Sequence, residues 1–347
     1  MKKLLIGLLT LILCLSLIGC DKTNNQSQYA DATTVSDIPN ETIDTSTEYK
    51  TETMKNDESA FEYEIVDGGA VITYFIGYSD GKEHSTDIVV PDKLNGYPVT
   101  TIGKLSFQKL QPMTSIILPA TVTTIEYGAF FECSKLTSVI GIENVTSIGE
   151  NAFYGCDVLT NITLPTTLTS IGACAFRDCE KLTSIHIPEG VTRIETETFY
   201  NCTSLVDILI PSTVTYICEN AFNSCNALTT LTIPDTVTTI EKWAIRECES
   251  LTNITWSKNA NMVDSAIYDC DALTTFTVPE GVTEMYSKSI NDCDNLTSIY
   301  LPASLSKIDD TLIFFNEDDE VVTVYAPAGS YAAENAVNDD MKFQAIE

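Results

Sequence analysis

The spacing of the cysteines constrains the fold of this chain more than any other feature. Six of them are each 23 residues apart, and two more follow after steps of 22 and 23 residues: Cys133, Cys156, Cys179, Cys202, Cys225, Cys248, Cys270 and Cys293. Leucine and proline columns keep the same step, as at Leu159, Leu182 and Leu205. A fixed period in the range of about 20 to 50 residues is typical of stacked repeats. The chain from about Thr86 to Ala326 is therefore expected to be one row of similar coils.

The repeat Leu182 to Cys202, LTSIHIPEGVTRIETETFYNC, shows what one coil contains. Ile185 and Ile187 alternate with polar residues, which predicts a short strand with one buried face. Pro188 ends this strand because it cannot donate to a sheet. A coil that buries one side only is unstable alone and stacks on its neighbours, in register and about 4.8 Å apart. The remaining predicted core positions are Leu182, Val191, Ile194 and Phe199.

Three strings at this period carry a family resemblance: Leu-Thr-Ser-Ile-x-Ile-Pro, Val-Thr-x-Ile and Ala-Phe-x-x-Cys. Together they resemble the BspA-like (treponemal-type) leucine-rich repeat family, over nearly all of the chain beyond residue 60. The resemblance implies a leucine-rich repeat solenoid, with a β-strand and an irregular or short helical turn in each coil of about 23 residues. It also implies an N-terminal β-hairpin cap, from Phe61 to Tyr74, and a C-terminal cap, from Val324 to Phe343. Local departures are Leu110 at the cysteine column, Ile142 and Ser257 at the proline column, and Trp256 in an inward strand position.

The N-terminus predicts export. Lys2 and Lys3 precede an apolar run from residue 4 to 18, which is too short for an ordinary membrane span and is typical of a signal peptide. Leu17-Ile18-Gly19-Cys20 resembles the bacterial lipobox, so Cys20 is the predicted lipid attachment site; a plain secretory peptide is the alternative. The predicted organisation is residues 1–19 signal peptide, 20–60 lipid anchor and disordered polar tether, 61–100 N-terminal cap and first coil, 101–320 leucine-rich repeats, and 321–347 last strand and C-terminal cap.

The charge of the chain excludes some partners. Acidic residues outnumber basic ones 49 to 19, for a net charge of −30 at pH 7. Such a surface repels nucleic acids and anionic lipid headgroups. We expect no nucleic-acid partner, and membrane contact through the N-terminal lipid only. The segment 21–60 has few large apolar residues, and it is expected to remain a disordered tether.

The cysteine column is predicted to be a structural ladder of buried thiols. In-register stacking makes neighbouring Cβ vectors parallel, which disfavours disulfides, and free cysteine packs as a small apolar residue. Cys174 and Cys218, outside the column, are expected to be the more exposed thiols. The chain has no Cys-x-x-Cys and only two histidines, so we expect no metal and no cofactor. It contains no motif of a hydrolase, metalloprotease or phosphate-binding loop, and we expect no enzyme.

The outward strand positions are the candidate binding residues. They form two columns on the expected concave sheet, and most of them are small hydroxyl residues. Larger groups that depart from this pattern are candidate contacts, because interfaces concentrate such side chains. The alternative is that threonine and isoleucine simply suit a strand surface. The candidate contacts are Ile117, Ile140, His186, Asp207, Leu209, Tyr300 and Tyr325.

An acidic ridge flanks the cysteine column. Like charges repeat there in successive coils, and calcium would relieve their repulsion. A solvated edge that keeps the protein soluble is the alternative. The ridge consists of Asp178, Glu180, Glu247, Glu249, Asp269, Asp271, Asp292 and Asp294.

The family resemblance and the anchor together predict a monomeric lipoprotein at the bacterial cell surface. The family implies a protein partner, through adhesion to host matrix proteins or to proteins of neighbouring cells. A glycan- or peptidoglycan-binding envelope module is the first alternative, suggested by Tyr300, Tyr325 and the hydroxyl columns. A structural spacer without a specific partner is the second.

Overall fold

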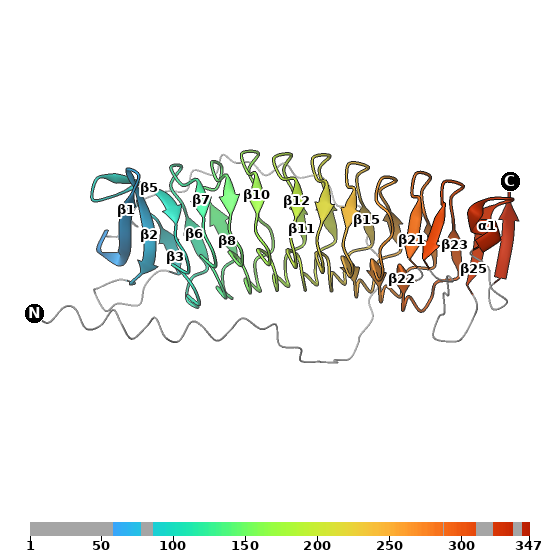
Figure 1. Ribbon diagram of the computed structural model, residues 1–347. Coiled ribbons are helices and arrows are strands. Elements are labelled where there is room, and N and C mark those ends of the chain that lie inside the picture. Colours follow the sequence, from blue (N-terminus) through green and yellow to red (C-terminus); the bar gives the residue numbers. More distant parts are fainter. Residues whose placement is uncertain (1–57, 78–85, 287, 310–321, 336–341) are drawn as a thin grey trace, which may run out of the picture. The chain divides into compact units, whose positions relative to one another are not determined.

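The computed structural model of the protein describes residues 58–77, 86–286, 288–309, 322–335 and 342–347 (Figure 1). The predicted signal peptide, the predicted lipid attachment at Cys20 and most of the predicted tether lie outside these residues. The regular secondary structure of the described part is almost entirely short β-strands joined by turns, with a 3-10 turn, η1 (Glu58–Ala60), and an α-helix, α1 (Tyr331–Asn335). Neither of these has the length and apolar surface needed to cross a bilayer.

Most coils begin with a strand of three residues, and these first strands pair in parallel in short sheets (Figure 1). Ile185 lies opposite Ile208, and His186 lies opposite Leu209. The partners are one period apart in the sequence, so the predicted in-register stacking is confirmed. The first strands are β3 (Asp87–Val89), β6 (Ser115–Ile117), β8 (Ser138–Ile140), β11 (Ser184–His186), β13 (Asp207–Leu209), β15 (Thr230–Thr232), β18 (Asn253–Thr255), β20 (Thr275–Thr277), β23 (Ser298–Tyr300) and β25 (Thr323–Pro327).

Most coils contain a second short strand that the sequence analysis did not anticipate. Ile194, expected only to enter the core, lies opposite Ile217, and Ile217 lies opposite Ile240. These second strands are β5 (Tyr97–Ile102), β7 (Thr124–Ile125), β9 (Ser147–Ile148), β10 (Ser170–Ile171), β12 (Arg193–Ile194), β14 (Tyr216–Ile217), β16 (Thr239–Ile240), β21 (Glu284–Tyr286) and β24 (Lys307–Asp309).

The predicted irregular turn is present in most coils, but three coils replace it with a third strand. These are the coils in which isoleucine takes the place of the core phenylalanine, as in the pair Ile245 and Ile267. Isoleucine is β-branched and favours extended backbone. The third strands are β17 (Ile245–Arg246), β19 (Ile267–Tyr268) and β22 (Ile290–Asn291).

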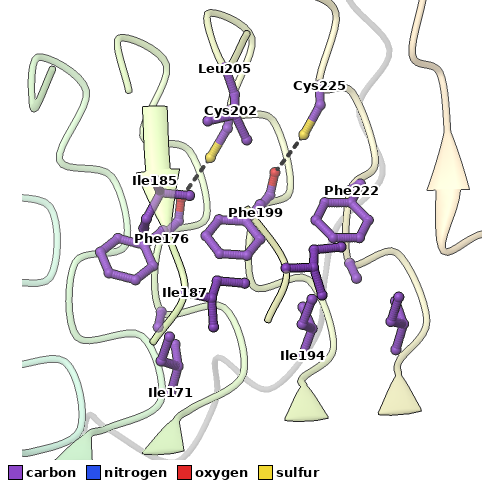
Figure 2. Close-up of a cluster of buried hydrophobic side chains, with 14 of the residues drawn as sticks. Ile171, Phe176, Ile185, Ile187, Ile194, Phe199, Cys202, Leu205, Phe222 and Cys225 are labelled. Carbon is purple, nitrogen blue, oxygen red and sulfur yellow. Dashed lines mark hydrogen bonds between the residues drawn. The ribbon is translucent and has the colours of Figure 1, made fainter. Parts of the chain in front are cut away.

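The core positions predicted for the repeat 182–202 are confirmed, since each of these side chains is at most 3% exposed. The phenylalanines of successive coils stack inside, with ring centroids 5.2 Å apart for Phe130 and Phe153. Figure 2 shows part of this column beside the buried strand isoleucines. The column extends further than predicted, because Phe107 stacks on Phe130 and also on Phe75 near the N-terminal end. Aromatic packing therefore runs continuously from the hairpin into the repeats.

Each cysteine of the column from Cys133 to Cys248 donates a hydrogen bond to the backbone carbonyl of the phenylalanine in the preceding coil. Cys202 Sγ lies 3.2 Å from the oxygen of Phe176 (Figure 2). That oxygen also accepts the backbone N–H of Cys179. All ten cysteines among the described residues are free thiols. The function of the column as a structural ladder stays a prediction.

The two cysteines outside the column differ in exposure. Cys174 is half-buried, as expected, but the prediction of an exposed thiol is wrong for Cys218, which is 3% exposed. The guanidinium of Arg193 covers it, with Nη2 3.3 Å from Sγ. Arg193 is held there by the ring of Tyr216, whose centroid is 4.0 Å from the guanidinium carbon. Burial and the nearby Glu195 carboxylate raise the pKa of Cys218 to about 11.

Left-handed backbone recurs twice in most coils. Cys174 and Asp178 have φ angles of 54° and 58°, and the same positions of the next coil, Glu197 and Asn201, have 56° and 57°. Residues with a side chain rarely adopt this conformation, although Asn and Asp tolerate it best. The two positions bracket the turn that carries the core phenylalanine. Each turn is therefore enclosed by two conformationally demanding residues.

The coil in which Ile142 replaces the proline has a physical explanation. Gly141 stands where the other coils place a large apolar residue, with φ +87°, and a Cβ there would lie 2.0 Å from the carbonyl oxygen of Leu118. Only glycine allows the two backbones to approach so closely. Ile142, at the proline position, is 5% exposed and takes the missing place in the core. Trp256 is buried, as predicted, and its Nε1 donates to the carbonyl of Ala260.

The predicted N-terminal hairpin is present. β1 (Phe61–Val66) and β2 (Gly69–Phe75) pair antiparallel, and β2 pairs in parallel with β5, which also pairs with β4 (Lys93–Leu94). At the other end, β25 pairs in parallel with β26 (Lys342–Ile346), and α1 follows β25 in the chain. That these two ends act as caps stays a prediction.

Candidate binding face

The first strands present two outward side chains in each coil. In β11 these are Ser184 and His186, on either side of the buried Ile185. The register of the strands aligns equivalent positions into two columns, which we call the sheet face. Its columns are Ser115, Ser138, Asn161, Ser184, Asp207, Thr230, Asn253, Thr275, Ser298 and Thr323, and Ile117, Ile140, Thr163, His186, Leu209, Thr232, Thr255, Thr277, Tyr300 and Tyr325.

The sheet face is almost free of charge, although the chain is strongly acidic. Between Ser115 and Tyr325 it contains one carboxylate, that of Asp207, and no lysine or arginine. The cores of protein interfaces are depleted of charged residues in the same way. The sheet face therefore requires little desolvation of charge when another molecule covers it.

The predicted contacts fall into three groups on this face. Ile117 and Ile140 are neighbours on β6 and β8, and both are half-buried. The second group is His186, Asp207 and Leu209. Thr163 separates the first two groups, which puts them about 10 Å apart at 4.8 Å per coil. Four coil steps, or about 19 Å, separate Leu209 from the third group, Tyr300 and Tyr325.

The coil that carries Asp207 and Leu209 has a further exposed apolar residue that the sequence analysis missed. In most coils a threonine precedes the first strand, and several of these hydroxyl groups donate to the carbonyl of the equivalent threonine in the preceding coil, as Thr183 does to Thr160 over 3.1 Å. Val206 takes this place in the next coil and is 53% exposed, and Leu209, three residues later, is 57% exposed. The replacement of the consensus threonine by valine at this position is the sequence feature that could have identified Val206. We call Val206, His186, Asp207 and Leu209 the central patch.

The polar members of the central patch contact each other. Nε2 of His186 lies 3.3 Å from Oδ2 of Asp207, and both side chains are about two-thirds exposed. An exposed pair of this kind contributes little to stability. Both groups are therefore available to a partner at small cost.

The tyrosines of the third group stack on each other. Their ring centroids are 4.6 Å apart and the planes differ by 11°. Both rings are half-buried. Tyr300 and Tyr325 thus form one flat aromatic surface at the C-terminal end of the sheet face.

Four of the eight residues of the acidic ridge have an explanation in the backbone. Asp178, Glu247, Asp269 and Asp292 occupy the left-handed position that precedes the cysteine, with φ between 53° and 58°. Aspartate is tolerated there, so its recurrence needs no ligand. Burial and then the carboxylates around it, Asp271 first, raise the pKa of Asp269 to about 6. In the ranges that the structure describes, no group of three or more His, Cys, Asp or Glu side chains is placed to hold a metal ion.

Comparisons with known proteins agree with this architecture. The family description "BspA type Leucine rich repeat region" matches in six copies, over residues 100–227 and 192–319. A leucine-rich repeat protein from Bacteroides ovatus is 26% identical, with a TM-score of 0.65 over 82% of this chain and 76% of that one. A leucine rich cell surface protein from Faecalibacterium prausnitzii is 22% identical, with a TM-score of 0.45 over 85% and 96% of the two chains. No curated protein has a matching sequence.

Proposed function

The chain belongs to the BspA-type leucine-rich repeat family, and on this premise we propose that it binds other proteins through the sheet face, with the central patch as the main contact. Repeat solenoids present extended surfaces to their partners. The supporting observation is the composition of the face. On this acidic protein the face is almost free of charge and rich in hydroxyl groups, and Leu209 near its middle is 57% exposed, with Val206, 53% exposed, three residues before it in the chain.

The central patch has the features of an interaction hot spot. Binding energy concentrates in a few apolar residues near the centre of an interface, surrounded by neutral contacts that exclude water. Val206 and Leu209 supply the apolar centre. The serines and threonines of neighbouring coils supply the surrounding contacts, and Asp207 adds one charged group that fixes orientation.

We place this activity outside the cytoplasm. The proposal rests on the predicted signal peptide and the predicted lipid attachment at Cys20, which indicate a lipid-anchored protein exposed at the bacterial surface. The partners in this proposal are host matrix proteins or proteins of neighbouring cells. Binding to them would make the protein an adhesin.

The test restores the repeat consensus. Threonine occupies the Val206 and Leu209 columns in other coils, so Val206→Thr with Leu209→Thr removes the apolar centre without disturbing the fold. Immobilised matrix proteins and surface extracts are screened with the natively expressed mature chain. We expect the double variant to lose about tenfold or more in affinity, since hot-spot side chains each contribute about 1–2 kcal/mol. A Thr232→Ser, Thr255→Ser variant on the same face is the control. Unchanged binding by the consensus variant contradicts the site.

Glycan binding is the second candidate, supported by the stacked Tyr300 and Tyr325. Flat aromatic surfaces beside hydroxyl groups suit the faces and edges of sugar rings. A glycan and peptidoglycan-fragment array at millimolar ligand tests it. Binding that disappears with Tyr300→Ser and persists with the consensus variant supports this function. An array on which no ligand binds contradicts glycan binding.

A further inference from the structure

The N-terminal hairpin continues the sheet that is formed by the second strands of the first coils, and the outermost strand of this sheet, β1, has one unpaired edge. β1 is the terminal strand in the order β1-β2-β5-β7-β9-β10, and no strand in the described ranges pairs with its other side. Such an edge leaves backbone N–H and C=O groups that another extended chain can bind. The edge of β1 therefore carries the backbone groups that strand addition requires.

Exposed apolar side chains are concentrated in the N-terminal strands that carry this edge. Among the described residues ten large apolar side chains are exposed, and five of them lie between residues 65 and 97. Ile65 and Val66 end β1 with 40% and 49% exposure. Tyr74 and Ile76, at the end of β2 and just beyond it, are 50% and 55% exposed. Single exposed apolar residues are ordinary, but a concentration of them marks a contact surface.

Two glutamates determine which partner fits. Glu62 lies opposite Tyr74 and Glu64 lies opposite Val71, on the face of the hairpin away from the buried Phe61. Both are exposed, and neither has an ion pair to another described residue. Two copies of β1 paired edge to edge would bring these carboxylates together, and like charges across strands are destabilising. The charge excludes self-pairing and favours a basic segment.

The hairpin is held in place by its first residues. A carboxylate oxygen of Glu58 accepts the backbone N–H of Asn95 over 3.1 Å. Phe61 is 3% exposed, and its ring lies 5.3 Å from that of Phe75 and 6.5 Å from that of Phe107. An edge fixed in this way loses little conformational freedom when a partner binds.

We propose that the outer edge of β1 binds an extended segment of a partner protein in which basic and apolar residues alternate. The basic residues lie on the outer face and pair with Glu62 and Glu64. The apolar residues lie on the inner face and extend the row of Phe61, Tyr63 and Ile65. This site is separate from the sheet face, which belongs to other strands, so each proposal can fail without the other.

Short synthetic peptides test the proposal on the mature chain. The probes are an alternating Lys-Val peptide, the same sequence with glutamate for lysine, and a Lys-Val peptide with N-methylated backbone. Site-resolved hydrogen exchange measures protection of residues 61–66. We expect the Lys-Val peptide to slow exchange there, whereas the other two do not, because one repels the glutamates and the other lacks backbone donors. Protection confined to other regions overturns the proposal.

Charge reversal on the protein gives an independent test. The Glu62→Lys, Glu64→Lys variant should bind the Lys-Val peptide about tenfold more weakly, from the loss of two ion pairs, and should gain affinity for the glutamate peptide. The control is Glu143→Lys with Glu249→Lys, which makes the same change in net charge at exposed sites away from the hairpin. An equal loss in the control means general attraction to an acidic surface and contradicts a β1 site.

Discussion

The thiol of Cys202 donates a hydrogen bond to the backbone carbonyl of Phe176 in the preceding coil, over 3.2 Å. The same contact recurs from Cys133 to Cys248 with distances of 3.0 to 3.4 Å. It lengthens to 4.0 Å at Cys270, where the acceptor belongs to an isoleucine. The thiol column therefore joins each coil to the one before it through the same turn that holds the phenylalanine.

Cys202→Ala should destabilise the protein by about 2 kcal/mol. About half of this is the lost hydrogen bond and the rest is the small cavity left by sulfur. The Phe176 carbonyl keeps its bond to the N–H of Cys179, which limits the cost. Urea unfolding measures the change. Cys174→Ala, outside the column and half-buried, is the control, and an equal loss in both variants contradicts a special contribution of the column.

The described thiols should resist alkylation in the native state. Burial raises the pKa of Cys133 and of Cys225 to about 12, and burial together with Glu197 raises the pKa of Cys174 to about 12. The reactive thiolate is therefore scarce at pH 8. We expect iodoacetamide to label these cysteines only after unfolding, as followed by peptide mass spectrometry. Rapid labelling of Cys133 or Cys225 in the folded protein would falsify this.

Asn151→Val should lower the free energy of unfolding by about 1–2 kcal/mol, whereas Asn151→Gly should leave it nearly unchanged. Asn151 has φ 57°, and a β-branched side chain clashes with the backbone in this conformation. Glycine already occupies the equivalent position in the preceding coil, at Gly128 with φ 58°. Paired thermal unfolding curves compare the variants. Similar melting temperatures for both variants would mean that the backbone relaxes.

Stability should fall as the pH rises from about 4 to 6, because of Asp269. Its pKa is raised from 3.8 to about 6, first by burial and then by Asp271, Glu247, Asp294 and Asp292. The folded state thus holds the proton more tightly than the unfolded state, so the stabilisation present below pH 4 is lost through pH 6. Solvent screens this half-buried group, and we expect a loss of about 1 kcal/mol.

Asp269→Asn is the matched variant for that effect. Asparagine has the same shape and accepts the left-handed backbone of this position. It should be more stable than the parent at pH 7 and should lack this part of the pH dependence. Urea unfolding at pH 4, 5, 6 and 7 provides the comparison, and parallel pH profiles for both proteins count against the assignment to Asp269.

The sequence alone predicted those candidate residues that differ from the repeat consensus at an outward strand position. Leu209 and Tyr300 stand out against threonine in the sequence alone. Val206 was missed because it precedes the strand, where exposure depends on how the chain enters the sheet. The exposure of Cys218 was predicted wrongly because Arg193, whose guanidinium covers the thiol, lies one coil earlier and is oriented by Tyr216. Such contacts between coils leave no trace in the pattern of one repeat.

The period of the sequence determined the stacked coils, their register and their buried residues, because side chains repeated every 23 residues bury one another only when equivalent positions align. It also indicated the hairpin through alternating residues around Asp67-Gly68. Only the tertiary structure decided which backbone positions are left-handed, that the coils with isoleucine in the phenylalanine column form a third strand, and that Val206 and Leu209 are both more than half exposed. These depend on distances between neighbouring coils, which a one-dimensional pattern does not contain.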